Sequence, residues 1–290
     1  MEKKWFVALL MVVVMMCACW TGAVADEERK TFTSGDYQYA LLDDGTVEIA
    51  GYKGSADLLA IPAELDGKAV TSIGDCAFYL CSSLTSVSIP DSVEQIGTNP
   101  FAACFELKTI SVSPEHPYFA TIDGVLFRKA DKALISYPAS ISSSTYTIPQ
   151  GITSIGDSAF FYCDSLTSVS IPDSITSLGD SAFFWCSSLT SVSIPDSVTS
   201  IGDSAFSYCD SLTSVSIPDS VTSIGNEAFY SCSSLTSVNI PDSVTSIGDY
   251  AFGDCSNLTL TVPRNSYAAE YAKTNNIPYT YPDANDWLNN

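Results

Sequence analysis

The sequence has few basic residues and a single histidine. Its 290 residues contain 12 Lys and Arg against 33 Asp and Glu, which gives a formal net charge of -21 at pH 7. A surface of this sign repels phosphate backbones and anionic lipid surfaces, so we expect neither nucleic acid nor a membrane surface as a partner. His116 alone cannot build a His-rich zinc or iron site. We predict no bound metal and no cofactor.

Long apolar runs are missing after the first residues of the chain. Lys3 and Lys4 precede an apolar run over residues 5–16, and Ala23-Val24-Ala25 follows. This order predicts a secretory signal peptide over residues 1–25, cleaved after Ala25, because a membrane-spanning helix needs about 20 apolar residues. An alternative is lipid modification at Cys17 or Cys19, where the sequence loosely resembles a bacterial lipobox. We therefore expect a secreted or cell-surface protein with no membrane span. We also expect it to be a monomer.

Signatures of catalysis are also missing. No serine lies in a G-x-S-x-G turn, and His116 lies in the irregular segment Pro114–Pro117. Sugar hydrolysis needs two acidic groups in contrasting environments, whereas the acidic residues here recur at regular intervals in the same local sequence. We predict no catalytic residues and no enzymatic activity.

The chain is built from an internal repeat of 23 residues. Copies begin at Leu166, Leu189, Leu212 and Leu235, and further copies begin at Leu84, Leu107 and Leu258. Within each copy the motif G-x-x-A-F-x-x-C recurs, with one alanine replaced by Pro100. Its phenylalanines are Phe78, Phe101, Phe160, Phe183, Phe206, Phe229 and Phe252. A period in this range is typical of solenoid proteins.

Each repeat predicts two short strands and a turn. Ser168-Val169-Ser170-Ile171 alternates as a half-buried strand does, and Pro-Asp-Ser then interrupts the ladder. A second extended piece, Val198–Ile201, ends at Gly202, where we expect a positive φ. Asp203–Phe206 predicts the start of a helical turn. One unit buries too little to fold alone, so about eight units should stack into a parallel sheet, forming a rod roughly 40 Å long at ~4.8 Å per strand.

The unit I-P-x-x-V-x-x-I-G-x-x-A-F-x-x-C resembles the BspA-like leucine-rich repeats of bacterial secreted and surface proteins, from about Tyr37 to Tyr281. The resemblance implies a curved leucine-rich-repeat solenoid with a role in adhesion or protein binding. It does not imply an enzymatic activity. It divides the chain into a hairpin cap over residues 26–60, a solenoid over 61–262, and a closing cap over 263–290 with a short helix after Ser266.

The repeat that begins at Leu107 is 36 residues long instead of 23. Its extra residues lie near 113–140, where Asp123-Gly124 and the turn Lys129–Lys132 predict two linked hairpins projecting from the rod. The insertion also gathers basic residues that are absent from 133–263. We consider His116, Arg128, Lys129 and Lys132 as a recognition spot, with an ordinary solvated hairpin as the alternative.

The cysteines recur once per repeat. Stacked side chains at one repeat position point the same way, whereas a disulfide needs converging Cβ vectors. We therefore predict a ladder of buried, reduced thiols, although export would permit disulfides and the pair Cys76 and Cys81 stays open. The ladder comprises Cys81, Cys104, Cys163, Cys186, Cys209, Cys232 and Cys255.

Three polar features recur in the repeats. The first is a set of small residues that face outward if Val and Ile face inward, suited to weak contacts with a protein or glycan or simply to solubility. Its candidate ligand-binding residues are Ser168, Ser170, Ser191, Ser193, Ser214, Ser216, Ser237 and Asn239, continued by Ser86 and Ser88.

The second feature is a column of aspartates that we interpret as turn residues, with calcium binding as the alternative. It comprises Asp91, Asp173, Asp196, Asp219 and Asp242. The third is Asp75, Asp157, Asp180, Asp203 and Asp249, expected to cap helix starts.

Two functions from different classes are compatible with these features. The first is an extracellular binding or adhesion module that engages a protein or glycan through the repeat surface. The alternative is a passive spacer without a specific ligand, which the near-identity of the four repeats from Leu166 favours.

Overall fold

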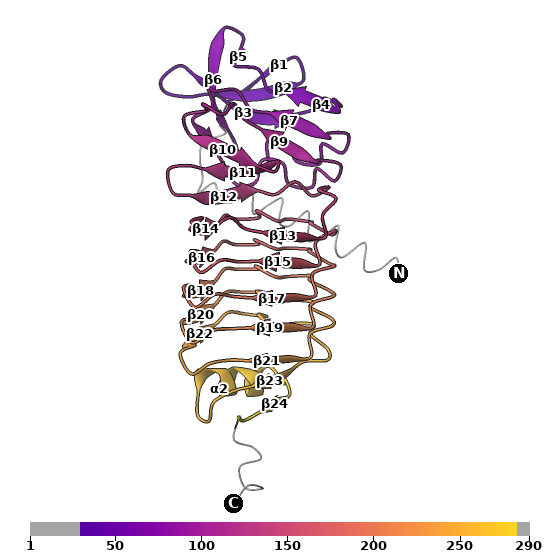
Figure 1. The fold of residues 1–290 in the computed structure, drawn as a ribbon, viewed down its shortest axis with the longest axis vertical. Helices are drawn as coiled ribbons and strands as arrows, with labels where there is room; N and C mark the ends of the chain where they lie inside the picture. Colours follow the sequence, from indigo (N-terminus) through magenta and orange to yellow (C-terminus); the bar gives the residue numbers. More distant parts are fainter. Residues whose placement is uncertain (1–29, 283–290) are drawn as a thin grey trace, which may run out of the picture.

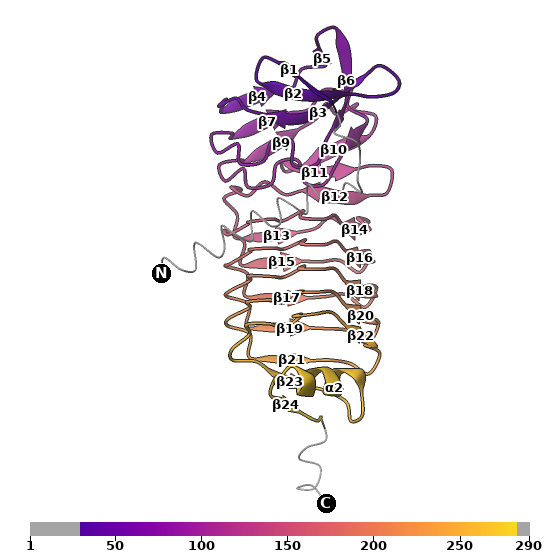
Figure 2. The ribbon, with the colours of Figure 1, turned by 180° about the vertical axis from the view of Figure 1, so that it is seen from behind.

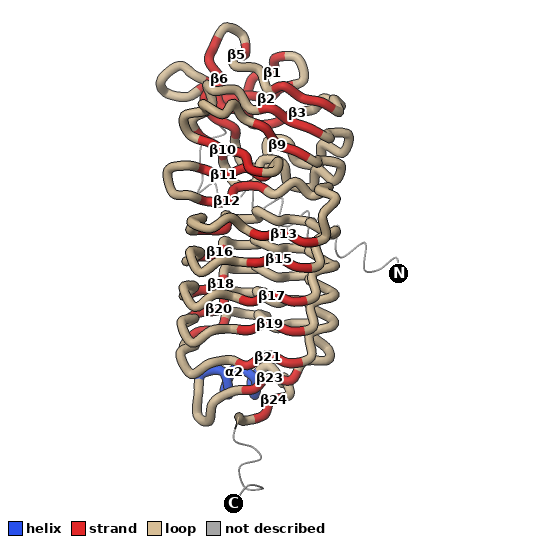
Figure 3. The backbone as a smooth tube through the Cα atoms, in the orientation of Figure 1, coloured by secondary structure: helices blue, strands red, loops and turns tan. Residues whose placement is uncertain are grey.

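The structure is a computed structural model that describes residues 30–282. The chain winds into an elongated rod whose strands lie across its long axis (Figures 1 and 2). The strands are short and are joined by longer loops and turns (Figure 3). The predicted repeat solenoid with parallel strands is confirmed, and within the described residues it makes about ten turns. We call each turn a rung.

Each rung in the C-terminal part contributes one strand to each of two parallel sheets. Identical repeat positions pair, so that Ser191 lies opposite Ser214 and Ile201 opposite Ile224. The first sheet contains β13 (Thr145–Thr147), β15 (Ser168–Ser170), β17 (Ser191–Ser193), β19 (Ser214–Ser216), β21 (Ser237–Asn239), β23 (Thr259–Thr261) and β24 (Tyr279–Thr280). The second contains β14 (Ser154–Ile155), β16 (Ser177–Leu178), β18 (Ser200–Ile201), β20 (Ser223–Ile224) and β22 (Ser246–Ile247).

The N-terminal part starts with the expected hairpin. Strands β2 and β3 pair antiparallel around Gly45, which has φ +84°. However, β3 also pairs parallel with β6, and β4 pairs parallel with β7, so residues before 61 already form rungs. This is why the described chain makes more turns than the eight repeats predict. The strands here are β1 (Thr31–Ser34), β2 (Tyr37–Leu41), β3 (Val47–Tyr52), β4 (Leu58–Ala60), β5 (Glu64–Leu65), β6 (Lys68–Ile73), β7 (Ser86–Ser88), β8 (Gln95–Ile96) and β9 (Thr109–Ser111).

The insertion forms the two predicted hairpins, from β10 (Phe119–Ile122), β11 (Val125–Arg128) and β12 (Ala133–Ser136). The expectation that they project from the rod is wrong, because β12 pairs parallel with β14 and continues the second sheet. Both faces of β11 and β12 are buried. Leu134 packs in the C-terminal core and Leu126 in the N-terminal core. A projecting hairpin would expose one of these apolar faces, so the insertion instead separates two cores.

The core is a set of stacked columns. The phenylalanines from Phe160 to Phe252 lie with ring centroids 4.8–5.3 Å apart and ring planes 4–11° apart. Tyr137 continues this column across the insertion, with its ring 5.0 Å from that of Phe160. Leucine, valine and isoleucine of each repeat are buried beside the rings. Each rung therefore supplies one member to every column, as the repeat predicts.

The segment after each glycine does not form the expected helical turn. It is a chain of tight turns in which Ser204 and Tyr208 have φ +53° and +60°. Its amides bond to the next rung instead: Phe206 N donates to Ala228 O at 2.7 Å. The segments after the glycines are therefore spaced like strands, whereas helices at this position would be about 10 Å wide and would force the rungs apart on one side. As a result, strands β13 to β23 stack in a nearly straight column rather than in the curve that the resemblance implies (Figure 1).

The predicted closing helix is present as α2 (Tyr267–Thr274). The hydroxyl of Ser266 accepts a hydrogen bond from Ala269 N at 3.1 Å, which satisfies an amide of the first turn. Ala268, Ala269 and Ala272 are buried against the last rung and cover the end of the core.

The aspartates after the glycines do not cap helices. Asp157 Oδ1 accepts a hydrogen bond from the Asp180 amide at 2.9 Å, and Asp180 Oδ1 accepts one from the Asp203 amide at 2.8 Å. The same contact continues through Asn226 to Asp249. Gly202 also departs from expectation, since its φ is not positive. These residues form an aspartate ladder that joins neighbouring rungs.

The eight cysteines of residues 30–282 are thiols in the structure. Ladder thiols donate to the phenylalanine carbonyl of the preceding rung, for example Cys209 Sγ to Phe183 O at 3.3 Å. Burial raises the pKa of Cys163, Cys209 and Cys232 well above the ordinary value, which disfavours the reactive thiolate.

We predict that these thiols persist in the isolated protein. Thiol titration of the denatured, unreduced chain lacking residues 1–25 should detect most of the eight cysteines, because the buried thiols do not ionise and cannot attack a disulfide. Cys76 and Cys81, which are only half-buried, are the pair most open to oxidation. Mass spectrometry that found four disulfides would contradict the reduced ladder.

Candidate functional site

The outward residues of the first sheet form a regular polar surface. In each of strands β15, β17, β19 and β21 the central valine is buried and both flanking residues are exposed. The flanking residues are in register from rung to rung, as Ser216 with Asn239 shows. The structure thus brings the eight predicted residues together as two parallel columns. We call this surface the serine array; it comprises Ser168, Ser170, Ser191, Ser193, Ser214, Ser216, Ser237 and Asn239.

The side chains of the serine array are available for contacts outside the chain. Among the described residues none of the eight donates or accepts a side-chain hydrogen bond within the protein, whereas neighbouring threonines do. Thr190 Oγ1, for example, donates to Thr167 O at 3.0 Å. Each array hydroxyl can therefore both donate and accept toward a ligand or water.

The array has a different extent from the one that the sequence predicts. Ser86 and Ser88 do not continue it, because β7 lies in a separate three-stranded sheet with β4 and β9. Thr145 pairs with Ser168 and Thr259 with Ser237, so threonines extend the first column at both ends. Thr147 and Thr261 extend the second column in the same way. Their repeats are degenerate, and only the strand register identifies them as members of the same surface.

His116 is not a surface recognition residue. Its side chain is 0% exposed, and its Nδ1 accepts hydrogen bonds from the amides of Tyr118 and Phe119, both at 3.2 Å. Nε2 lies 3.2 Å from Pro90 O, which places the ring proton there. Burial lowers the pKa of the imidazole, so it is neutral at pH 7. The ring fixes the loop before β10 and cannot contact a ligand.

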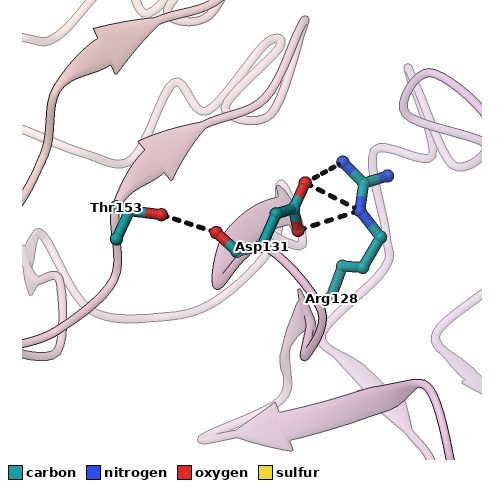
Figure 4. A network of polar contacts seen from close by, with 3 residues as sticks. All are labelled: Arg128, Asp131 and Thr153. Atoms are coloured by element: carbon teal, nitrogen blue, oxygen red, sulfur yellow. Dashed lines mark hydrogen bonds and ion pairs between the residues drawn. The ribbon is translucent and has the colours of Figure 1, made fainter.

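The other three basic candidates lie on the β11–β12 turn, and two of them are already engaged. Arg128 holds the Asp131 carboxylate with Nη2 2.7 Å from Oδ2, and the Asp131 carbonyl accepts from Thr153 (Figure 4). Lys129 Nζ donates to His116 O at 2.6 Å. Lys132 is exposed at φ +53°. The insertion therefore offers one unengaged cation, Lys132, among these four residues rather than a concentrated basic spot.

The acidic columns do not assemble into a metal site. Across residues 30–282 no group of three or more His, Cys, Asp or Glu side chains is placed to hold a metal ion. Asp173, Asp196, Asp219 and Asp242 are exposed after their prolines, as the turn interpretation predicts.

Comparison with protein families supplies the deciding observation. The sequence pattern of the BspA type leucine-rich repeat region matches six copies over residues 62–142 and 135–259. The chain belongs to this family. Comparison with curated protein sequences finds no match.

Solved structures agree with the BspA-type fold. A leucine-rich cell surface protein from Faecalibacterium prausnitzii A2-165 is 25% identical with a TM-score of 0.58, covering 86% of this chain and 98% of that one. A leucine-rich repeat protein from Eubacterium ventriosum ATCC 27560 is 22% identical with a TM-score of 0.51, covering 79% and 89%. None of the helical segments between residues 30 and 282 has the length and apolar character that a bilayer-spanning helix requires.

A second surface of this BspA-type protein was not foreseen from its sequence. Aromatic residues occupy one or both of the two positions after the core phenylalanine in four successive rungs, from Phe160 to Phe229. Several of them form a cluster outside the main core. Phe161 and Phe184 are buried beneath this layer. The half-buried or exposed members are Phe105, Tyr162, Trp185, Tyr208 and Tyr230, which we call the aromatic strip. The signal is visible in the sequence as F-F-Y, F-F-W and F-S-Y at 23-residue spacing.

Proposed function

We propose that this BspA-type repeat protein is a monomeric extracellular binding or adhesion module that engages a protein or a glycan through the serine array. The observation that supports it is the set of in-register columns of outward polar side chains that have no hydrogen-bond partner among residues 30–282. A flat surface of paired donors and acceptors can add many weak hydrogen bonds over several rungs. Binding of this kind requires no catalytic group, and the name of the F. prausnitzii relative, a cell surface protein, fits an extracellular location.

The experiment is a binding assay of the chain lacking residues 1–25 against immobilised extracellular-matrix proteins and a glycan array. Replacing Ser191, Ser193, Ser214 and Ser216 together with arginine, and separately with glutamate, should weaken capture at least about tenfold, because bulky charged groups prevent close contact with a flat surface. The fold should persist, since these side chains point away from the core.

The matched control carries the same substitutions on the second sheet, at Ser177, Ser200, Ser223 and Ser246, and should bind as the unchanged chain does. Capture should also vary little with salt, because the array itself is uncharged. A chain that captures nothing at physiological salt is a spacer, and the proposal then fails. If a ligand is found and its affinity is unchanged in the array variants, the binding surface is not the serine array.

A further inference from the structure

The aromatic strip interrupts the uniformity of the repeats. Tyr162, Trp185 and Tyr208 occupy one repeat position, at which the other rungs have Leu80, Ala103, Ser231 or Asp254. Their rings stack at 4.9 and 4.8 Å with planes 9° and 16° apart. Phe105 meets one end edge-on, and Tyr230 meets the other. The result is a continuous aromatic surface on repeats whose other exposed residues are mainly Ser, Thr and Asp.

These aromatic residues occupy an unfavourable backbone conformation. Tyr162, Trp185 and Tyr208 have φ of +61°, +59° and +60°. Glycine, asparagine and aspartate adopt this left-handed region most readily, whereas bulky side chains are strained there. Three successive rungs retain large aromatic rings at such a position although Ser and Asp fill it in later rungs. Because Ser and Asp can occupy this position, the fold does not require the strained aromatic residues. Their presence therefore indicates a role in binding rather than in stability.

The stacking selects among ligands. Because each ring covers the face of the next, the strip presents ring edges. A sugar ring, which binds aromatic residues face to face, has no open face between the stacked rings. The row of edges instead suits the aliphatic stems of long side chains, and Trp and Tyr are the residues enriched at the centres of protein interfaces.

The charge around the strip is negative. Burial and the Asp164 carboxylate raise the pKa of the Tyr162 phenol to about 12, and burial with Glu227, Asp254 and Asp210 raises the pKa of Tyr208. Tyr230 donates its hydroxyl proton to Asp254 Oδ2 at 2.7 Å. No Lys or Arg occurs anywhere between Lys132 and Arg264 to offset these carboxylates. A cationic partner therefore gains both hydrophobic and electrostatic contacts here.

We propose that the aromatic strip is a second binding surface, independent of the serine array, that takes an extended protein segment bearing lysine or arginine. The side-chain stems would lie along the ring edges, and the cationic heads would reach the flanking carboxylates. Asp164 and Asp210 hold the same repeat position two rungs apart, about 10 Å at strand spacing. Three residues of an extended polyproline II segment span about 9 Å, so a cation at every third residue matches this spacing.

The test uses a synthetic peptide with lysine at every third position and Ser and Gly elsewhere. Trp185 is the reporter, in the chain lacking residues 1–25 and carrying Trp287→Phe to remove the other tryptophan. The peptide should change Trp185 emission saturably, and affinity should fall at least about tenfold as ionic strength rises from about 0.05 to 0.5 M. The double variant Tyr162→Asn, Tyr208→Asn should bind at least about tenfold more weakly, while its thermal transition remains cooperative because Asn tolerates a positive φ.

The matched control is Tyr250→Asn, which removes an aromatic ring that is 67% exposed at φ +53° outside the strip and should leave peptide binding unchanged. The serine-array variants should also keep peptide binding, so the two proposals can fail separately. Equal binding of a peptide with glutamate in place of lysine would overturn the assignment of a cationic partner. Binding to phosphatidylcholine vesicles in place of the peptide would show a membrane contact, and unchanged affinity in the double variant would place the site elsewhere.

Discussion

Replacing Phe206 by alanine should destabilise the protein by about 3–5 kcal/mol, the usual range for a fully buried phenylalanine. The ring is 0% exposed and lies between Phe183, at 5.1 Å, and Phe229, at 5.3 Å. Removing it breaks two stacking contacts and leaves a cavity that neighbouring rungs cannot close, because backbone hydrogen bonds on both sides fix their spacing. Chemical denaturation with hydrogen exchange measures the loss.

The loss should be greatest near the substituted rung, since each rung contacts only its neighbours. Amides of residues around 183–229 should exchange faster, while those of β2 and β3 keep their protection. Phe105→Ala is the control, because that ring is 43% exposed and its removal should cost far less. A change below about 0.5 kcal/mol for Phe206→Ala would place its ring at the surface and contradict the register of the core.

The strands and core columns could be predicted because their signal is local and repeated. The alternation of Ser168, Val169 and Ser170 fixes which side chain is buried, and the repeat period then aligns every copy. The same reasoning predicts the outward orientation of the eight residues of the serine array, which are exposed in the structure. It does not predict that Ser86 and Ser88 lie in a separate sheet. It could not extend the array to Thr145 or Thr259, because only the pairing between rungs shows that those residues continue its columns.

The connecting segment could not be predicted from local signals. Asp203-Ser204-Ala205 has the residues of a helix start, yet the Ser204 amide donates to Asn226 O at 2.7 Å in the next rung. Contacts with a residue about 22 positions away decide this conformation, and they satisfy the amides that a helix would have satisfied internally. Because no helix forms in this segment, strands β13 to β23 stack in a nearly straight column (Figure 1).

The insertion shows the same limit. Asp123 and Gly124, with φ +52° and +82°, form the turn that the sequence predicts. The sequence does not show the position of the hairpins. The apolar residues on both faces of β11 are buried by two separate cores, and those cores are known only from the folded structure. Burial of His116 follows from that position.

The aromatic strip is not predicted from the repeats for a different reason. Alignment of the repeats emphasises what is constant, whereas Tyr162, Trp185 and Tyr208 lie at a position that varies. In a solenoid the core positions stay constant because they pack against neighbouring rungs, whereas an exposed position that varies is free to recognise a specific ligand. The variation at this position therefore supports the proposed binding role rather than that of a spacer.

Replacing Gly225 by alanine should destabilise the protein by more than the roughly 1–3 kcal/mol of ordinary overpacking. Glycine is not required here for a positive φ. It is required because there is no room for a Cβ atom at this position. A Cβ on Gly225 would lie 2.6 Å from Asp203 N and 2.7 Å from Gly202 C, closer than van der Waals contact allows. Because these are backbone atoms of the preceding rung, no side-chain rotation relieves the clash, and the two rungs must separate.

Separation should break the aspartate ladder at this point, where Asp203 Oδ1 accepts from the Asn226 amide at 2.7 Å. Urea denaturation measures the total loss, and faster exchange of the Asn226 amide locates it. Gly151→Ala is the control: its φ is +88° and nothing lies within 4 Å of the added methyl, so only the left-handed strain of about 1–2 kcal/mol applies. If Gly225→Ala costs no more than this control, the glycine column does not set the spacing of the rungs, and the hydrogen bonds between rungs alone must hold them together.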